Sequence, residues 1–321
     1  MKHIERWLSC TALASALVAS GQTMPPWSRG ANDPAPDKGV QFQVTDVDNV
    51  PDLHGDPSGA RLVLFIGGNQ FFVLPRLIAG FEALHPDLKG HIFYETLPPG
   101  ILRKQIAAGG TLTLGNLTLQ VIPDVYEAGE RVLNEMQAKG EVTEVAAYAT
   151  NTLAIMVAKG NPKKVLSLKD LGQPAIRLSM PNPQWEGVAN QITEALRKAG
   201  GEPLATAVYQ SKLAGGTTRL TEIHHRQTPM RIMAGDADAG VTWASEVIFQ
   251  EKIGNPLMGI KIPDSQNSTA TYAAGIVAGA RHKEAAQQWI AYLQTADAQA
   301  AYQEFGFRSL PASAKQGRPA E

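Results

Sequence analysis

Residues 221–246, TEIHHRQTPMRIMAGDADAGVTWASE, join a polar run to a short helix and a buried strand. The polar run is HHRQT, and the apolar spacing over 229–234 predicts a helix that follows it. The apolar residues 241–243 then predict a buried strand that ends at Trp243. A helix that begins among such donors can bind an anion, because its first N–H groups and its dipole favour negative charge. A solvated helix start beside a core tryptophan is the alternative interpretation.

Apolar strands alternate with helical segments over most of the chain. The unbroken apolar run at 61–66 predicts a buried parallel strand, and the pattern after its glycine turn predicts a helix over 71–84. The other predicted strands are 91–94, 123–126, 151–157, 176–180 and 273–277, and the other predicted helices are 101–108, 130–139, 188–199, 282–294 and 296–305. This alternation indicates parallel sheets, so we expect an α/β fold. Residues 111–122 alternate like an inserted hairpin with its turn at 115–116.

The composition is that of a globular protein with no general affinity for polyanions. The chain has 321 residues, 44% hydrophobic and 18% charged, and this length leaves room for two domains. Its formal net charge of -1 gives no support to nucleic-acid binding or to a basic membrane-binding surface. Any affinity for an anion must therefore be local, and we expect no nucleic-acid partner.

Residues 1–20 have the pattern of an export signal, in which basic residues precede a short apolar core and a stretch of small residues. Cys10, the only cysteine, lies inside that core, so the exported chain would have no disulfide. Residues 21–60 are rich in Pro, Gly and Asp, and we expect a leader that lies along the surface or is partly disordered, with His54 in a loop. The sequence therefore predicts a protein of the periplasm.

Five segments, taken together and in this order, resemble bacterial periplasmic solute-binding proteins of type II, and most of all the molybdate-binding subunit of an ABC transporter. The segments are FIGGNQFFVLPRLIAGFEALHP, PDVYEAG, NTLAIMVAKGNP, GDADAGVTWASE and HKEAAQQWIAYLQTADAQAAYQEFGF. The resemblance covers about residues 62–307. It implies two α/β lobes, each a mainly parallel sheet flanked by helices, joined by two hinge strands.

The resemblance also implies a division of the chain and a mode of action. Lobe 1 would comprise 61–149 and 262–321, and lobe 2 would comprise 150–261, with the chain crossing near Thr150 and Ile262. The protein would capture a small anion in the cleft between the lobes and close on it like a hinge, without turnover. It would deliver the anion to the membrane permease of an ABC importer, and we expect a monomer.

The resemblance, together with the polar residues beside its motifs, places ligand contacts where strands end and helices begin. The predicted ligand-binding residues are Asn69, Gln70, Gly100, Gly187, Val188, His225, Arg226 and Trp243. The sequence departs from the family at several of them. Asn69 and Pro98-Pro99-Gly100 stand where the family has serines, and Trp243 stands where it has tyrosine. A molybdate-like oxyanion and a small organic anion both stay open as ligands.

Arg226 and His225 would replace the missing hydroxyl donors. The planar guanidinium of Arg226 suits a carboxylate or another oxyanion. Protonation of His225 would raise the affinity for an anion at mildly acid pH. The alternative is that Arg226 pairs with an acid such as Glu222 or Glu246 and points to solvent. Trp185 could add a flat wall to the pocket beside Trp243.

The motifs of common hydrolases and zinc enzymes are missing from the sequence. It contains neither G-x-S-x-G nor H-E-x-x-H, and the adjacent His224 and His225 cannot easily ligate one tetrahedral ion. We therefore expect no catalytic residues, no metal and no cofactor. The alternative function is a sensor or accessory protein of the same fold that does not serve transport. Whether His224, Arg103 and Lys104 face the cleft stays open.

Overall fold

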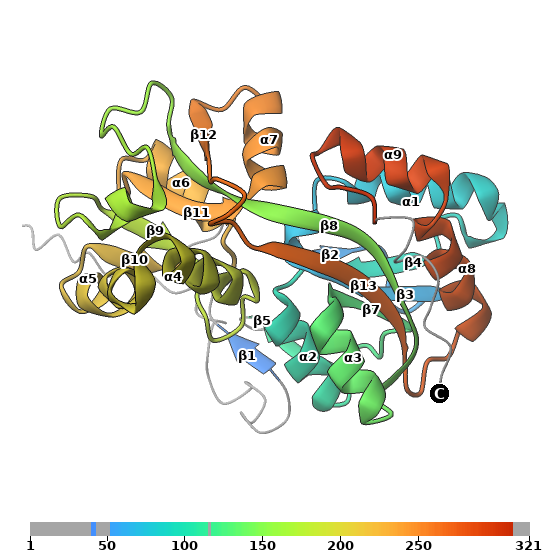
Figure 1. The fold of residues 1–321 in the computed structure, drawn as a ribbon. Helices are drawn as coiled ribbons and strands as arrows, with labels where there is room; N and C mark the ends of the chain where they lie inside the picture. Colours follow the sequence, from blue (N-terminus) through green and yellow to red (C-terminus); the bar gives the residue numbers. More distant parts are fainter. Residues whose placement is uncertain (1–39, 43–51, 115–116, 311–321) are drawn as a thin grey trace, which may run out of the picture.

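The computed structural model has two α/β lobes joined by the long strands β8 and β13 (Figure 1). It describes residues 40–42, 52–114 and 117–310. The predicted export signal, most of the predicted leader and the predicted hairpin turn lie outside the described residues. Within the part that is described, no helix combines the length and the apolar character needed to cross a membrane. The predicted two-lobed α/β fold is confirmed.

The sheet of lobe 1 runs in the order β2-β4-β3-β7-β13-β8. Strand β3 is parallel to β4 and β7, whereas β2, β13 and β8 add antiparallel pairs. The strands are β2 Leu53–His54, β3 Leu62–Ile66, β4 Ile92–Glu95, β7 Val125–Gly129, β8 Val142–Ala158 and β13 Thr269–Val277. The helices are α1 Leu74–Leu84, α2 Pro99–Ala107, α3 Glu130–Ala138, α8 Lys283–Leu293 and α9 Ala296–Glu304. Every residue of β3 is buried, as its unbroken apolar sequence requires.

Lobe 2 continues the same sheet beyond β8 in the order β8-β11-β9-β10, and β12 also pairs with β8. Strand β9 is parallel to β10 and β11, whereas β11 and β12 are antiparallel to β8. The strands are β9 Leu178–Met180, β10 Thr218–Leu220, β11 Ala239–Trp243 and β12 Leu257–Lys261. The helices are α4 Val188–Thr206, α5 Lys212–Ala214, α6 Gln227–Met233 and α7 Ala244–Lys252. Each lobe therefore combines parallel strands with antiparallel crossing strands.

A small second sheet involves the leader. Strands β5 (Thr111–Leu114) and β6 (Leu117–Gln120) form the predicted antiparallel hairpin, and β1 (Val40–Phe42) pairs with β5 in parallel. Leader residues also form β2, so the predicted loop around His54 is wrong. The ring of His54 stacks on Tyr94 of β4 with 4.2 Å between the centroids, because the pairing of β2 with β4 places the two side by side.

Strand β8 is 17 residues long and crosses from one lobe to the other. Residues 142–152 pair with β13, and residues 153–158 pair with β11 and β12. The sequence predicts only 151–157 as a strand, because the residues before them lack a continuous apolar run. Partly exposed and polar side chains are tolerated there because the backbone is held on the sheet by β13.

Two helices differ from their predicted bounds. A helix is predicted to begin at residue 71, but α1 begins only at Leu74. A 3-10 turn over Gly68–Gln70 comes before it. Helix α4 extends beyond the predicted residue 199, but Gly200 and Gly201 have non-helical backbone angles, so the extension is a second helical piece. Glycine is suited to this junction because Gly201 has φ +71°.

The lobes share one apolar core along the crossing strands. Phe72, just before α1, stacks on Phe249 of α7 with 4.9 Å between ring centroids. Phe305, at the end of α9, lies 5.1 Å from Phe72. Trp243 of β11 meets Tyr272 of β13 at 5.8 Å. These aromatic contacts pack lobe 1 against lobe 2 and hold the edges of the sheet that carry the site.

Candidate functional site

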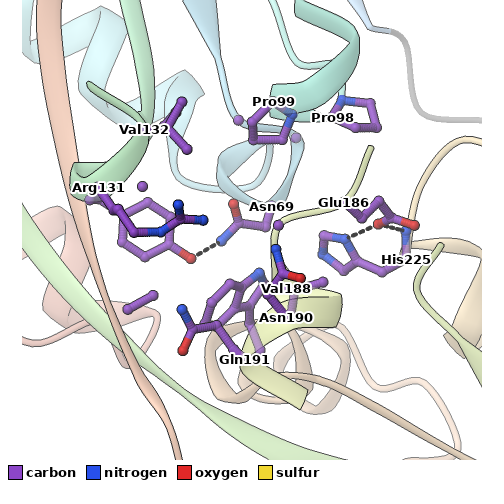
Figure 2. Close-up of a pocket in the computed structure, with 18 of the residues that line it drawn as sticks. Asn69, Pro98, Pro99, Arg131, Val132, Glu186, Val188, Asn190, Gln191 and His225 are labelled. Carbon is purple, nitrogen blue, oxygen red and sulfur yellow. Dashed lines mark hydrogen bonds and ion pairs between the residues drawn. The ribbon is translucent and has the colours of Figure 1, made fainter. Parts of the chain in front are cut away.

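A pocket of about 330 Å³ lies between the lobes (Figure 2). Lobe 1 contributes the turns that follow β3, β4 and β7, and the crossing strand β13 adds residues 269–272. Lobe 2 contributes the turn before α4, the turn before α6 and the end of β11. The carboxyl ends of parallel strands meet at one edge of a sheet, so the helices that follow them begin around this pocket.

Two helices, one from each lobe, direct their first turns into the pocket. Helix α3 begins after Gly129, and its residues Glu130, Arg131 and Val132 line the pocket. Helix α4 begins after Gly187, which also lines it. Neither helix start has a side-chain cap. In α4 the N–H groups of Ala189 and Asn190 donate to the carbonyl oxygens of Glu186 and Gly187, which leaves the N–H of Val188 for an anion. The first N–H groups of α3 have no acceptor within the helix, and both helix dipoles favour an anion here.

Arg131 supplies the guanidinium of the pocket. Among the lining residues that the structure describes, it is the one arginine or lysine. Its side chain is 74% exposed and forms an ion pair with Glu135, one turn further along α3, at 2.5 Å. The sequence analysis missed this residue. A cation in the first turn of a helix opposes the dipole, and this unfavourable position was the available signal of a functional role.

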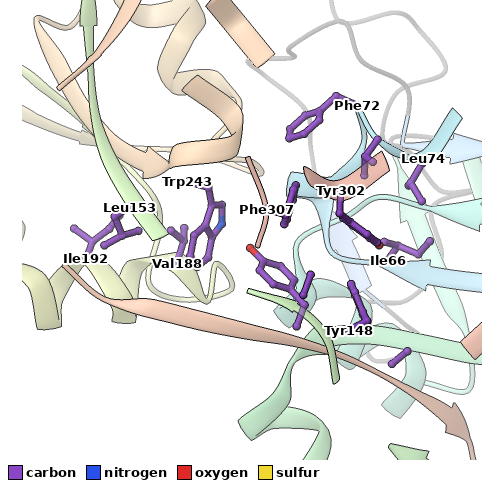
Figure 3. Packing of buried hydrophobic residues seen from close by; sticks show 14 of the residues in the cluster. Ile66, Phe72, Leu74, Tyr148, Leu153, Val188, Ile192, Trp243, Tyr302 and Phe307 are labelled. Atoms are coloured by element: carbon purple, nitrogen blue, oxygen red, sulfur yellow. The ribbon is translucent and has the colours of Figure 1, made fainter. Parts of the chain in front are cut away.

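The walls of the pocket combine an amide with aromatic rings. The side-chain amide of Asn69 donates a hydrogen bond to the hydroxyl of Tyr272 at 2.7 Å, so that donor is already occupied. Trp243 closes the lobe 2 side, next to Val188 at the start of α4 (Figure 3). The pocket is therefore flanked by flat, apolar surfaces as well as by N–H groups.

The structure brings five of the eight predicted ligand-binding residues to the pocket. The lining includes Asn69, Gly187, Val188, His225 and Trp243. It does not include Gln70, Gly100 or Arg226. The open question about the cations is answered in part, because His224 lines the pocket whereas Arg103 and Lys104 do not. The roles of the lining residues in binding stay predictions.

Gln70 is turned away from the pocket and into the core of lobe 1. Its side-chain oxygen accepts hydrogen bonds from Tyr148 at 3.0 Å and from Tyr302 at 2.8 Å. The Tyr148 hydroxyl also lies 2.8 Å from the carboxylate of Glu127. The indole N–H of Trp289 donates to the same carboxylate at 2.6 Å. Burial raises the pKa of Glu127 to about 7 despite these donors. Through Gln70, this hydrogen-bonded cluster holds the turn after β3 in place.

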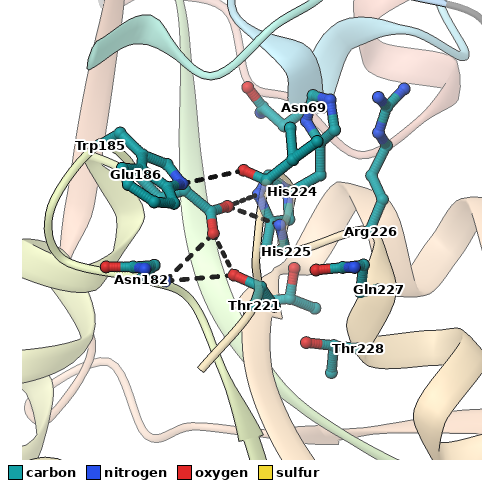
Figure 4. A network of polar contacts seen from close by, with 12 residues as sticks. Asn69, Asn182, Trp185, Glu186, Thr221, His224, His225, Arg226, Gln227 and Thr228 are labelled. Atoms are coloured by element: carbon teal, nitrogen blue, oxygen red, sulfur yellow. Dashed lines mark hydrogen bonds and ion pairs between the residues drawn. The ribbon is translucent and has the colours of Figure 1, made fainter. Parts of the chain in front are cut away.

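His225 is clamped between two buried carboxylates, and Figure 4 shows its contacts with one of them, Glu186. Its Nδ1 lies 2.7 Å from Glu186, and its Nε2 lies 2.9 Å from Glu246. Burial alone would lower the pKa of His225, but Glu246 and Glu186 outweigh that effect and raise it to about 10. The ring is therefore charged throughout the neutral range, and both nitrogens are engaged. The expectation that its protonation would raise anion affinity at mildly acid pH is wrong for this reason.

Arg226 is buried outside the pocket lining and pairs with the leader residue Asp52. Its guanidinium lies 2.5 Å from the carboxylate of Asp52 and 4.8 Å from the ring centroid of Phe71. Asp52 also accepts from Nε2 of His224 at 3.1 Å. Burial would raise the pKa of Asp52, but His224 and Arg226 lower it to about 2. The alternative in which Arg226 points to solvent is wrong, because its side chain is 2% exposed. Arg226 also helps to lower the pKa of Glu246, but its ion pair is with Asp52, 174 residues away.

Gly100 makes a contact across the cleft. Its N–H donates to the carbonyl oxygen of Trp185 at 3.0 Å, so it is not available to a ligand. Trp185 packs here against α2, where the Lys104 ammonium lies 6.0 Å from its ring centroid, and its indole N–H donates to Ile223 at 3.2 Å. It does not line the pocket, so the predicted second flat wall from Trp185 is wrong.

The comparisons with known proteins identify the class. The family model for bacterial extracellular solute-binding proteins matches residues 62–308, so the chain belongs to this family. It is 22% identical over 307 residues to the molybdate-binding protein ModA of Mycobacterium tuberculosis H37Rv, covering 94% of this chain and 98% of that protein. It is 25% identical over 227 residues to an aconitate isomerase of a Pseudomonas species, covering 66% of this chain and 85% of that protein.

The fold comparison agrees with the family assignment. The periplasmic molybdate-binding protein of Azotobacter vinelandii superimposes with a TM-score of 0.61 at 19% identity, covering 78% of this chain and 99% of that one. At this identity the similarity shows the fold. The resemblance to type II solute-binding proteins that the sequence predicts is confirmed.

Within the described residues, no group of three or more His, Cys, Asp or Glu side chains is placed to hold a metal ion. The clustered carboxylates and histidines of the site instead neutralise one another, as the His225 and Asp52 contacts show. The chemistry that the pocket offers to a ligand is therefore that of N–H donors, one guanidinium, the amides and hydroxyls of Asn190, Gln191, Thr269 and Thr271, and aromatic walls.

We expect His225→Gln to lower the free energy of unfolding by about 3–5 kcal/mol at pH 7, because two buried carboxylates lose their cation. The folded pKa of about 10 lies above the ordinary 6.5. The stabilisation by His225 is therefore complete below about pH 6.5 and is lost as the pH rises toward 10. Urea unfolding at a series of pH values measures both effects. His91→Gln, at an exposed histidine, is the control, and equal stability of the two variants would contradict the clamp.

We expect Gly100→Ala to separate the lobes, because the new Cβ would lie 2.7 Å from the backbone of Trp185. Spin labels at the exposed positions Ala83 and Lys163, in a chain with Cys10 replaced by serine, report the interlobe distance. The variant should shift the distance distribution to longer values. Gly59→Ala, whose Cβ would meet only the Asp56 side chain at 3.4 Å or more, should leave it unchanged. Identical distributions for Gly100→Ala and the unsubstituted chain would disprove this contact.

Proposed function

We propose that the protein captures a small anion in the pocket between its lobes and delivers it to the permease of an ABC importer. The observation that carries this proposal is the convergence of the first turns of α3 and α4, from opposite lobes, on one pocket that also contains Arg131. An anion held there would contact both lobes at once, so its binding would favour the closed arrangement.

The charges of the pocket support an anionic ligand. His225 and Glu186 are paired with each other, and His224 is bound to Asp52. Glu130 stands at the first position of α3, where a carboxylate is compatible with the helix dipole. Arg131 is then the exposed full positive charge of the lining, and the helix starts add their partial charges. A cationic ligand would be repelled by Arg131 and by the partial positive charges of the helix starts.

Capture by lobe closure is consistent with the way the lobes are connected. We infer that residues 61–149 and 262–321 move as one body against 150–261. The backbone pairing of β8 with β13, whose register shifts between Tyr272 and Ala273 and between Ala274 and Ile276, would form the hinge. The contact between Gly100 and Trp185 would form at the mouth of the cleft. The predicted export signal and the family both support action outside the cytoplasm, as a monomer that meets its permease there. Neither the overall charge nor the site favours nucleic acid.

The engagement of the pocket's titratable groups argues against catalysis. Acid–base chemistry needs a group that can take or give a proton at the substrate. Both ring nitrogens of His225 lie against carboxylates, and the carboxylate of Glu186 accepts from the backbone and ring of His225. These groups hold the turn before α6 in place. A sensor or accessory role of the same binding site is the second candidate, and it differs only in the partner.

We expect one anion per chain in titration calorimetry of the protein with sulfate, molybdate, succinate, butyrate and benzoate. Arg131→Gln should lower the affinity for the tightest-binding of these anions about tenfold to a hundredfold, because it removes a charge-assisted contact worth roughly 1.5–3 kcal/mol. Arg103→Gln, at a residue outside the lining, should leave the affinity unchanged. Arg226→Gln should change stability more than affinity, because Arg226 serves Asp52. Absence of binding by all five anions would refute the proposed function.

A further inference from the structure

The pocket is larger than a tetrahedral oxyanion requires. Its volume of about 330 Å³ equals that of roughly ten water molecules at about 30 Å³ each. An ion such as sulfate or molybdate has five heavy atoms and would leave most of this space to water. Pockets of roughly 300 Å³ and more are typical of organic ligands.

The donors in the pocket are too few on the lobe 1 side to surround a small dianion. Pro98 and Pro99 line the pocket but have no N–H group, and the N–H of Gly100 is bound to Trp185. The side-chain amide of Asn69 donates to Tyr272. A desolvated dianion needs a donor at each oxygen, because an unpaired buried charge costs several kcal/mol. From the turns of lobe 1, Arg131 and the start of α3 are left to recognise negative charge, and β13 adds the hydroxyls of Thr269 and Thr271.

Part of the remaining lining is apolar and flat, beside the polar side chains of Asn190, Gln191, Thr269 and Thr271. Trp243 and Tyr272 are nearly buried, with 6% and 5% of their surfaces exposed, and their rings stand at 60° to each other. Val188 and Val132 flank the helix starts, and the two prolines cover the lobe 1 side. Such walls stabilise a carbon skeleton by burying it, at about 0.8 kcal/mol per CH₂ group, which corresponds to roughly fourfold in affinity.

From these observations we infer that the ligand is a small organic carboxylate, which rests on the proposed function of the same pocket. Its carboxylate binds the planar guanidinium of Arg131, the first N–H groups of α3 and the N–H of Val188. Its carbon skeleton lies against Trp243, Tyr272 and the two prolines. Because Glu135 holds Arg131 at 2.5 Å before binding, the ligand carboxylate competes with an exposed partner that contributes little.

Arg131 and Val132 are then the residues that determine specificity, one for charge and one for the carbon skeleton. Arg131→Lys keeps the charge but cannot form the two parallel bonds, so it should recover only part of the affinity that Arg131→Gln loses. Val132→Thr keeps the shape but places a hydroxyl on the apolar wall. This variant should lower the affinity for organic acids several-fold and leave the affinity for sulfate unchanged.

The test is a competition experiment on the full chain, with binding followed by calorimetry and by the fluorescence of its tryptophans. The probes are butyrate, succinate and benzoate against sulfate and molybdate. The inference expects at least one organic acid to bind ten times more tightly than both inorganic ions, and to lose at least tenfold in Arg131→Gln and several-fold in Val132→Thr. Conservation of the melting temperature in both variants shows that they fold.

The outcomes separate this inference from the proposed function. If sulfate or molybdate binds more tightly than every organic acid, the inference is overturned, and the proposed function of anion capture stands. If the organic acid binds but Val132→Thr and Arg131→Gln do not weaken it, the assigned contacts are wrong and the inference fails. If none of the five probes binds, the proposed function fails and the inference fails with it.

Discussion

The antiparallel pairing of β8 with β13 is the constraint on which the rest of the structure depends. One strand of 17 residues belongs to the sheets of both lobes, and its partner returns beside it, so the lobes cannot slide along each other without breaking this register. The parallel strands on either side therefore present their carboxyl ends to a common cleft. The helices that follow those strands begin there, and a site for an anion results from the topology itself.

The charged side chains of the site show how such a cleft can be held together without binding a ligand. Placing a charge in a protein interior costs several kcal/mol unless it is paired. His225 meets this requirement with Glu186 and Glu246, and Arg226 meets it with Asp52. These ion pairs engage His225 and Arg226, the two cations that the sequence predicts as ligands of an anion. The pocket is left with the starts of two helices and with Arg131, whose side chain is exposed and paired only with Glu135 of its own helix among the described contacts.

The leader has a structural role that its composition conceals. Its strand β2 pairs with β4 in lobe 1, while Asp52, directly before β2, binds Arg226 and His224 in lobe 2. A segment rich in Pro, Gly and Asp thus connects the two lobes through one carboxylate. Aspartate in such a segment ordinarily stabilises a turn, so no local sequence pattern distinguishes Asp52 from the other aspartates of the leader.

The fold was predictable from the sequence because it rests on local signals. Unbroken apolar runs such as 61–66 mark buried parallel strands, and glycine turns followed by helical spacing mark the helices at their ends. The same signals place Asn69, Val188 and Trp243 near the cleft.

The contacts of single charged residues were not predictable, because they depend on pairs far apart in sequence. Arg226 and Asp52 are separated by 174 residues. Arg131 carries one local signal, a cation in the first turn of a helix, but the sequence does not show which lobe or cleft that turn faces.

A crystal structure of the chain with the tightest-binding anion of the titration panel tests the central claim most directly. The account predicts one anion per chain between the first turns of α3 and α4, with the guanidinium of Arg131 within hydrogen-bonding distance and the pair of Asp52 and Arg226 intact. An anion bound instead to Arg226 and His224, with Asp52 displaced, would contradict it.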